Sequence, residues 1–137
     1  MIAEFAECRE SAGRLKSVLT ERPTVALIED DEAVAKAYSR CLASLASVIV
    51  FTKADLFVPT LQRTPFDLVL TDRIGLPYVE RIKEVAPDLQ IVVVSGMEAP
   101  PQLPVGVALW LVKPIPTETL YALVERELDV FGLTMIS

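Results

Sequence analysis

The short apolar run Leu68-Val69-Leu70, which leads through Thr71 to Asp72, constrains the fold more than any other stretch of the sequence. A continuous run of this kind is typical of a strand that is buried on both faces, as in a parallel sheet. Asp72 would then lie at the carboxyl end of the strand, where open parallel sheets bind their ligands. The carboxylate is either placed there for chemistry or only caps the helix that follows.

Further apolar runs, separated by stretches with helical spacing, repeat this arrangement along the chain. The predicted strands are 24–28, 48–51, 66–71, 89–94 and 107–112. The predicted helices are 54–62, 75–85, 117–130 and one that Asp31 caps at its N-terminus. Alternating strands and helices predict an α/β fold, in which right-handed crossovers join the strands of a parallel sheet.

An apolar seam with alternating spacing of four and three residues predicts a helix over residues 1–19. The seam consists of Met1, Phe5, Cys8, Ala12, Leu15 and Leu19. Because charged residues fill its other faces, we expect this helix to bury the seam against a second copy of the chain or against its own domain. The expected organisation is an N-terminal amphipathic helix (1–20), one α/β domain (21–131) and a short tail (132–137).

Composition narrows the chemistry that this chain can perform. Hydrophobic residues make up 52% of the sequence, which favours a sheet covered on both faces. The sequence has no histidine, which excludes Ser-His-Asp and Cys-His catalysis as well as His-ligated zinc. Carboxylates without soft ligands favour a hard cation such as Mg²⁺.

Charge and cysteine content indicate the setting in which the protein works. The net charge of -6 disfavours direct binding of nucleic acid. No apolar run approaches the roughly 20 residues of a membrane span. Cys8 and Cys41 are not spaced as a disulfide framework, so we expect a cytoplasmic location.

Every predicted strand but the second ends in a polar residue that is suited to chemistry. These residues are Glu29 and Asp30, Asp72, Ser95 and Lys113. In a parallel sheet they would meet at one edge. The acids would hold a divalent cation, and the cation and Lys113 together would neutralise a phosphoryl group delivered to Asp72. The alternative for Glu29 and Asp30 is a solvated cap.

These strand ends resemble the receiver domain of bacterial two-component response regulators, of the chemotaxis-regulator type. The matching stretches are Leu27-Ile28-Glu29-Asp30-Asp31, Phe66-Asp67-Leu68-Val69-Leu70-Thr71-Asp72, Ile91-Val92-Val93-Val94-Ser95-Gly96 and Trp110-Leu111-Val112-Lys113-Pro114. They follow the family's order and cover residues 24 to about 130. The resemblance implies a flavodoxin-like, doubly wound sheet of five parallel strands in the order 2-1-3-4-5.

The resemblance also implies a role for each matching residue. Asp72 matches the phosphoacceptor, and Glu29 and Asp30 match the acidic pair that holds Mg²⁺ together with Asp72 and the backbone carbonyl of Ile74. A sensor histidine kinase or a phosphotransfer protein would supply the phosphoryl group. A downstream protein partner would then bind the activated domain.

The remaining matches concern the switch that follows phosphorylation. Ser95 matches the switching hydroxyl, Lys113 the invariant lysine, and Trp110 the aromatic residue that changes rotamer on activation. The Lys113–Pro114 bond is expected to be cis, as in the family.

Two regions depart from the family pattern. The loop after Asp72 is shortened, because Ile74-Gly75-Leu76 matches the start of the third helix. The proline-rich segment 98–106 stands in place of the fourth helix, since three prolines in five residues forbid a regular helix. The 1–19 helix is a candidate to cover the vacated surface, and a homodimer would form through residues 1–19 or the 98–112 face.

Three functions fit the sequence to different degrees. The first is a single-domain receiver that is phosphorylated on Asp72, acts through protein contacts and is not an enzyme. The second is a pseudo-receiver that binds or dimerises without phosphorylation. The third and weakest is a small flavodoxin-like enzyme, because the sequence lacks the glycine-rich loop that would hold a phosphate group in such an enzyme.

Overall fold

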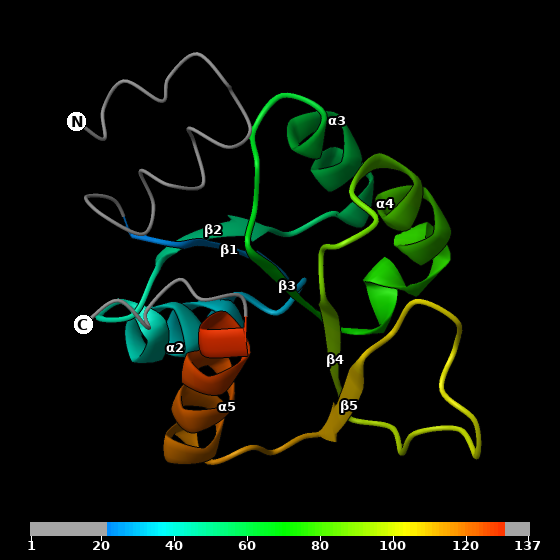
Figure 1. The fold of residues 1–137 in the computed structure, drawn as a ribbon. Coiled ribbons are helices and arrows are strands. Elements are labelled where there is room, and N and C mark those ends of the chain that lie inside the picture. The colour runs from blue at the N-terminus through cyan, green and yellow to red at the C-terminus, as the bar shows by residue number, and fades with distance from the viewer. Residues whose placement is uncertain (1–21, 131–137) are drawn as a thin grey trace, which may run out of the picture.

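Five parallel strands form a single sheet in the order β2-β1-β3-β4-β5 (Figure 1). The computed structural model describes residues 22–130. The strands are β1 (Thr24–Ile28), β2 (Ser47–Phe51), β3 (Leu68–Thr71), β4 (Ile91–Ser95) and β5 (Leu109–Val112). The flavodoxin-like fold class and strand order expected from the sequence are confirmed.

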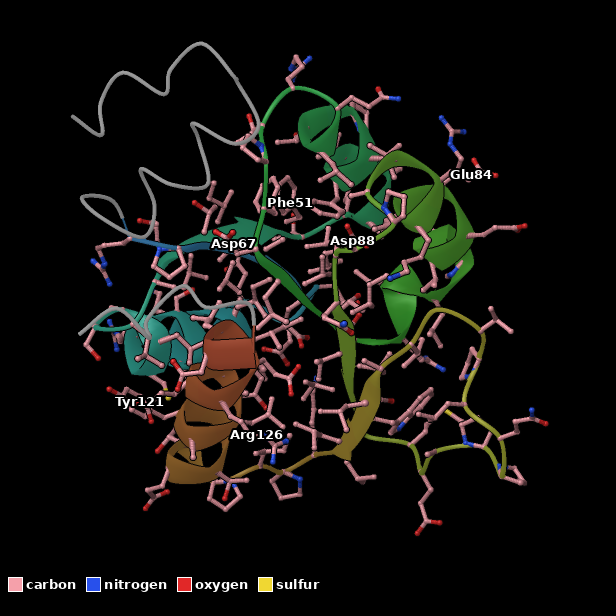
Figure 2. All side chains as sticks on the ribbon, viewed as in Figure 1. Phe51, Asp67, Glu84, Asp88, Tyr121 and Arg126 are labelled. Carbon is pink, nitrogen blue, oxygen red and sulfur yellow. The ribbon has the colours of Figure 1, made fainter. Side chains whose placement is uncertain are left out.

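Helices cover both faces of this sheet (Figure 1). The helical segments are α2 (Glu32–Leu42), η2 (Ala54–Leu56), α3 (Phe57–Leu61), η3 (Arg73–Tyr78), α4 (Val79–Val85) and α5 (Thr117–Val130). Helices α2 and α5 pack on one face, and α3 and α4 pack on the other. Figure 2 shows Phe51 directed from β2 into the layer beneath α3, where its ring contacts Phe57 edge-on.

The apolar runs of β1, β3 and β4 form the buried centre of the sheet. Every residue of β3 and β4 is buried, and so are Val25 to Ile28 of β1. The edge strands are more open, since β2 exposes Ile49 and Val50, and β5 exposes Val112. Continuous apolar runs therefore identified all five strands, but they did not distinguish the buried central strands from the more open edge strands.

The predicted helix over 75–85 is wrong in its first half. Residues Arg73–Tyr78 form a 3-10 helix, and regular α-helix begins only at Val79. Gly75 N–H donates to the carbonyl of Asp72 at 3.2 Å, which is the tight three-residue spacing of a 3-10 turn. Pro77 lies inside this segment and has no N–H to donate to an α-helical bond.

Four predicted strands and one predicted helix have different limits in the structure, and for strand 48–51 the difference is only that it begins at Ser47. Strand 66–71 begins at Leu68, and the carboxylate of Asp67 just before it accepts the N–H of Thr24 at 2.8 Å. Strand 107–112 begins at Leu109, and strand 89–94 is shifted to Ile91–Ser95. The predicted helix 54–62 is divided into η2 and α3.

The connection from β4 to β5 contains no helix within the described part of the chain. Residues 96–108 form an open loop that returns against α4, and Gly106 there has a φ of 96°, a conformation that favours glycine. A Cβ at this position would lie 2.7 Å from Val79 Cγ1. The replacement of the family's fourth helix by a proline-rich loop is thus confirmed.

Several expectations fall outside residues 22–130. They are the 1–19 helix, the dimer contact through it and the tail 132–137, which stay predictions. Within the described residues, no helix has both the length and the apolar character required to cross a membrane.

Candidate functional site

The carboxyl ends of β1, β3, β4 and β5 meet at one edge of the sheet. The register pairs Ile28 with Thr71 and Thr71 with Val93, so the residues that follow β1 and β3 are neighbours. Asp72 N–H donates to the carbonyl of Ile28 at 2.9 Å, which holds the first residue after β3 beside the end of β1. The sheet therefore fixes the positions of the polar residues at its edge.

Three acidic residues form a cluster at this edge. Glu29, Asp30 and Asp72 each offer a carboxylate oxygen, and these atoms lie within 4.8 Å of one another. Glu29 and Asp72 are buried, whereas Asp30 is exposed. Carboxylates this close repel one another unless a cation relieves them, and their hard oxygen donors suit Mg²⁺.

Lys113 supplies the positive charge of the site in the described structure. Its Nζ lies 2.9 Å from Glu29 Oε1. The second oxygen of Glu29 accepts the N–H of Asp31 at 3.1 Å. Burial lowers the pKa of Lys113, but the hydrogen bond and charge of Glu29 outweigh it, and the charge of Asp72 adds to them, so the pKa rises above its ordinary value. The Lys113–Pro114 bond is cis, as expected from the sequence.

Asp72 caps the following segment and is also part of the acidic cluster. Its Oδ1 accepts the N–H of Ile74 at 2.8 Å. Burial raises the pKa of Asp72 to about 6, the Ile74 hydrogen bond opposes this rise, and the neighbouring acids Glu29 and Asp30 add to it. Asp72 can therefore cap the following segment and also take part in chemistry, since only one of its two carboxylate oxygens forms the cap.

Ser95 is buried at the end of β4, and its Oγ accepts the N–H of Met97 at 3.0 Å. The carbonyl of Ser95 accepts the N–H of Lys113 at 2.7 Å, which joins the ends of β4 and β5. The hydroxyl proton of Ser95 stays available for donation to a ligand at this edge. The switching role assigned to Ser95 by resemblance stays a prediction.

One residue near the site, Arg73, was not assigned a role by the sequence analysis. Arg73 Nη1 lies 3.6 Å from Met97 Sδ, and the Met97 carbonyl accepts Trp110 Nε1–H at 2.9 Å. A basic residue directly after Asp72 was the available signal for Arg73. The Ile74 carbonyl, predicted as a metal ligand, keeps that role as a prediction.

Gly75 allows the backbone after Asp72 to approach β3. A Cβ at Gly75 would overlap Thr71 Oγ1. That hydroxyl donates to the carbonyl of Asp72 at 2.8 Å. The absence of a side chain at Gly75 therefore keeps Asp72 in its observed backbone position.

We expect Gly75→Ala to lower the free energy of unfolding by about 1–3 kcal/mol, because the added methyl group must displace Thr71. The matched control is Gly96→Ala, since a Cβ at Gly96 has no atom within 4 Å. This control should change stability by less than about 0.5 kcal/mol. Urea denaturation of both variants tests the difference, and equal stabilities would contradict the close approach.

Solved structures with the same fold include several response regulator receiver domains. The BeF3-activated DrrB receiver domain, of a Thermotoga maritima regulator, is 23% identical with a TM-score of 0.71, covering 79% of this chain and 98% of its own. A CheY-like receiver domain from Methanospirillum hungatei is 17% identical, with a TM-score of 0.72 and coverages of 81% and 97%. The non-phosphorylated HemR receiver domain from Leptospira biflexa is 20% identical, with a TM-score of 0.71 and coverages of 79% and 95%.

These similarities establish the fold of the chain. No family model matches the sequence, and no curated protein sequence matches it. The described chain has the fold of response regulator receiver domains.

Proposed function

We propose that this chain is a receiver that accepts a phosphoryl group on Asp72 from a histidine kinase or phosphotransfer protein, in a reaction that depends on Mg²⁺. The observation that carries this proposal is the gathering of Glu29, Asp30 and Asp72 at one sheet edge, with Lys113 beside them. Clustered acids cost stability when no cation is bound, so their presence together favours a working site.

The geometry supports a role for Asp72 as the nucleophile. One carboxylate oxygen is held by the Ile74 N–H, which leaves the other to attack phosphorus. A P–O bond to Asp72 forms as the bond between phosphorus and the donor breaks, and the donor keeps the bonding electrons. With a pKa of about 6, Asp72 is largely ionised at neutral pH and needs no base to remove a proton.

The other residues hold and neutralise the transferred group. Glu29, Asp30 and Asp72 would hold Mg²⁺, which stabilises the charge on the phosphoryl oxygens when it is bound. Lys113 lies close enough for the charge of Asp72 to raise its pKa, so it is placed to offset phosphoryl charge. Ser95 would donate its hydroxyl proton to a phosphoryl oxygen.

The effect of phosphorylation would pass to a downstream protein through contacts rather than through turnover of a small substrate. The open β4–β5 loop and the half-exposed β5 offer a surface different from the usual helical one. We expect no enzymatic activity beyond the phosphoryl transfer and its hydrolysis.

Intact mass spectrometry after incubation with acetyl phosphate and Mg²⁺ tests the proposal. The expected result is one added phosphoryl group in the wild-type protein and none in Asp72→Asn. Omission of Mg²⁺ should abolish the addition. A wild-type protein that stays unmodified would favour the pseudo-receiver. Two observations also fit that alternative: Lys113 is paired with Glu29, and no helix lies between β4 and β5 in the described residues.

We expect the phosphorylated protein to lose its phosphoryl group slowly. Ile74 and Met97, two residues after Asp72 and Ser95, are apolar, and their side chains offer water only the weak acceptor sulfur of Met97. The decay of the phosphorylated mass, followed after the phosphodonor is removed by desalting, measures this lifetime. A half-life of seconds would contradict the expectation.

A further inference from the structure

Three contacts from separate parts of the site edge converge on Met97. Its N–H donates to Ser95 Oγ at 3.0 Å. Its carbonyl accepts Trp110 Nε1–H at 2.9 Å, and its Sδ lies 3.6 Å from Arg73 Nη1. Met97 thus connects the residue that follows Asp72 with both Ser95 and the aromatic residue on β5.

The partner of Arg73 in this arrangement is a weak one. A guanidinium group prefers charged, planar oxygen acceptors, whereas a thioether sulfur accepts hydrogen bonds only weakly. Among residues 22–130, the Arg73 guanidinium has no other hydrogen bond or ion pair. Its side chain is exposed, so it can exchange this contact at little cost for a better one.

The charge at this edge indicates what the better partner would be. Three carboxylates face one lysine, and a bound divalent cation would bring the edge close to neutrality. A phosphoryl group on Asp72 would carry about -1.5 to -2 charges and present three acceptor oxygens. The edge would then hold excess negative charge, which a guanidinium one residue away is placed to offset.

We propose that Arg73 is a positioning residue for the phosphoryl group, and that it leaves Met97 Sδ to bind phosphoryl oxygens when Asp72 is modified. This inference rests on the proposed function. The exchange forms charge-assisted hydrogen bonds and breaks only the sulfur contact, with no covalent change. It also releases the side chain of Met97, whose backbone carbonyl accepts Trp110 Nε1–H, so we expect the environment of the indole to change.

Titration with beryllium fluoride and Mg²⁺, followed by calorimetry, tests this role with a phosphoryl analogue that needs no transfer chemistry. We expect Arg73→Met to weaken analogue binding by about tenfold, and Arg73→Lys to recover part of the loss. Met97→Leu should bind at least as tightly as wild type, because it removes the competing sulfur contact. Arg63→Met is the matched control, since Arg63 lies before β3 at the opposite sheet edge.

The outcomes separate this inference from the function on which it rests. A wild-type protein that neither binds the analogue nor gains phosphoryl mass overturns the proposed function and the Arg73 role with it. A wild-type protein that binds, with Arg73→Met equal to it in affinity, overturns the Arg73 role alone. A tenfold loss in Arg73→Met with partial recovery in Arg73→Lys, and no loss in Arg63→Met, supports both.

Discussion

Replacing Lys113 with methionine is expected to lower the free energy of unfolding by about 3 kcal/mol at neutral pH without Mg²⁺, because the change leaves Glu29 buried without its cation. Glu29 is 2% exposed, so water cannot replace the lost partner. Because the pKa of Lys113 is raised in the folded protein, its charge stabilises the fold fully at any pH below the ordinary lysine pKa. This stabilisation is lost only as the pH rises through the raised pKa of the folded protein. Urea denaturation at neutral pH measures the difference.

Two further variants make this prediction specific. Lys83→Met is the matched control, since Lys83 Nζ donates at 2.9 Å to the neutral carbonyl of Leu89, and its loss should cost about 1 kcal/mol. Adding Glu29→Gln to Lys113→Met should recover most of the loss, because the amide oxygen can still accept the Asp31 N–H. An unchanged stability in Lys113→Met, or no recovery in the double variant, would contradict the buried ion pair.

The opposite effect is expected at Asp72. Asp72→Asn should raise the free energy of unfolding by about 2–3 kcal/mol at pH 7.5 without Mg²⁺, because the variant no longer ionises a buried carboxyl whose pKa is about 6. The asparagine oxygen can keep the hydrogen bond from Ile74 N–H. The rise corresponds to a melting temperature higher by roughly 10 °C.

The pH dependence of this stabilisation follows from the direction of the pKa shift. Burial gives this carboxyl a higher pKa in the folded protein than in the unfolded protein. The protonated carboxyl therefore stabilises the fold relative to the ionised one. This advantage is complete at a pH below the pKa of the unfolded protein and is lost as the pH rises through the pKa of the folded protein. The gap between Asp72→Asn and wild type should therefore grow from about pH 4 to about pH 6 and stay constant above it. Thermal unfolding across this range tests it, and a gap that is absent at pH 7.5 would contradict the buried acid cluster.

Magnesium should act on these two variants in opposite ways. In Lys113→Met the cation would replace the lost positive charge, so it should raise stability more than in wild type. In Asp72→Asn the cation loses a ligand, so it should raise stability less than in wild type. The same denaturation experiments with and without Mg²⁺ provide both comparisons.

The sheet and its polar edge were predictable because local patterns determine them. Continuous apolar runs marked β1, β3 and β4, and the residue after each run identified Glu29, Asp30 and Asp72. The proline-rich segment likewise excluded a helix before β5.

The remaining features depend on contacts that no local pattern contains. Lys113 and Glu29 are 84 positions apart, and only the folded sheet brings their charged atoms together. The 3-10 segment after Asp72 follows from the approach of Gly75 to Thr71, which helical spacing alone did not reveal. A single arginine has no periodicity, so the contact of Arg73 with Met97 was found only in the structure.

Borohydride reduction of the phosphorylated protein, followed by peptide mass mapping, tests the central claim most directly, since it converts an aspartyl phosphate to homoserine in place. We expect homoserine at position 72 alone, in protein treated with acetyl phosphate and Mg²⁺ and not in untreated protein. Homoserine at another aspartate, or none at all despite an added phosphoryl mass, would contradict the assignment of Asp72 as the phosphoacceptor.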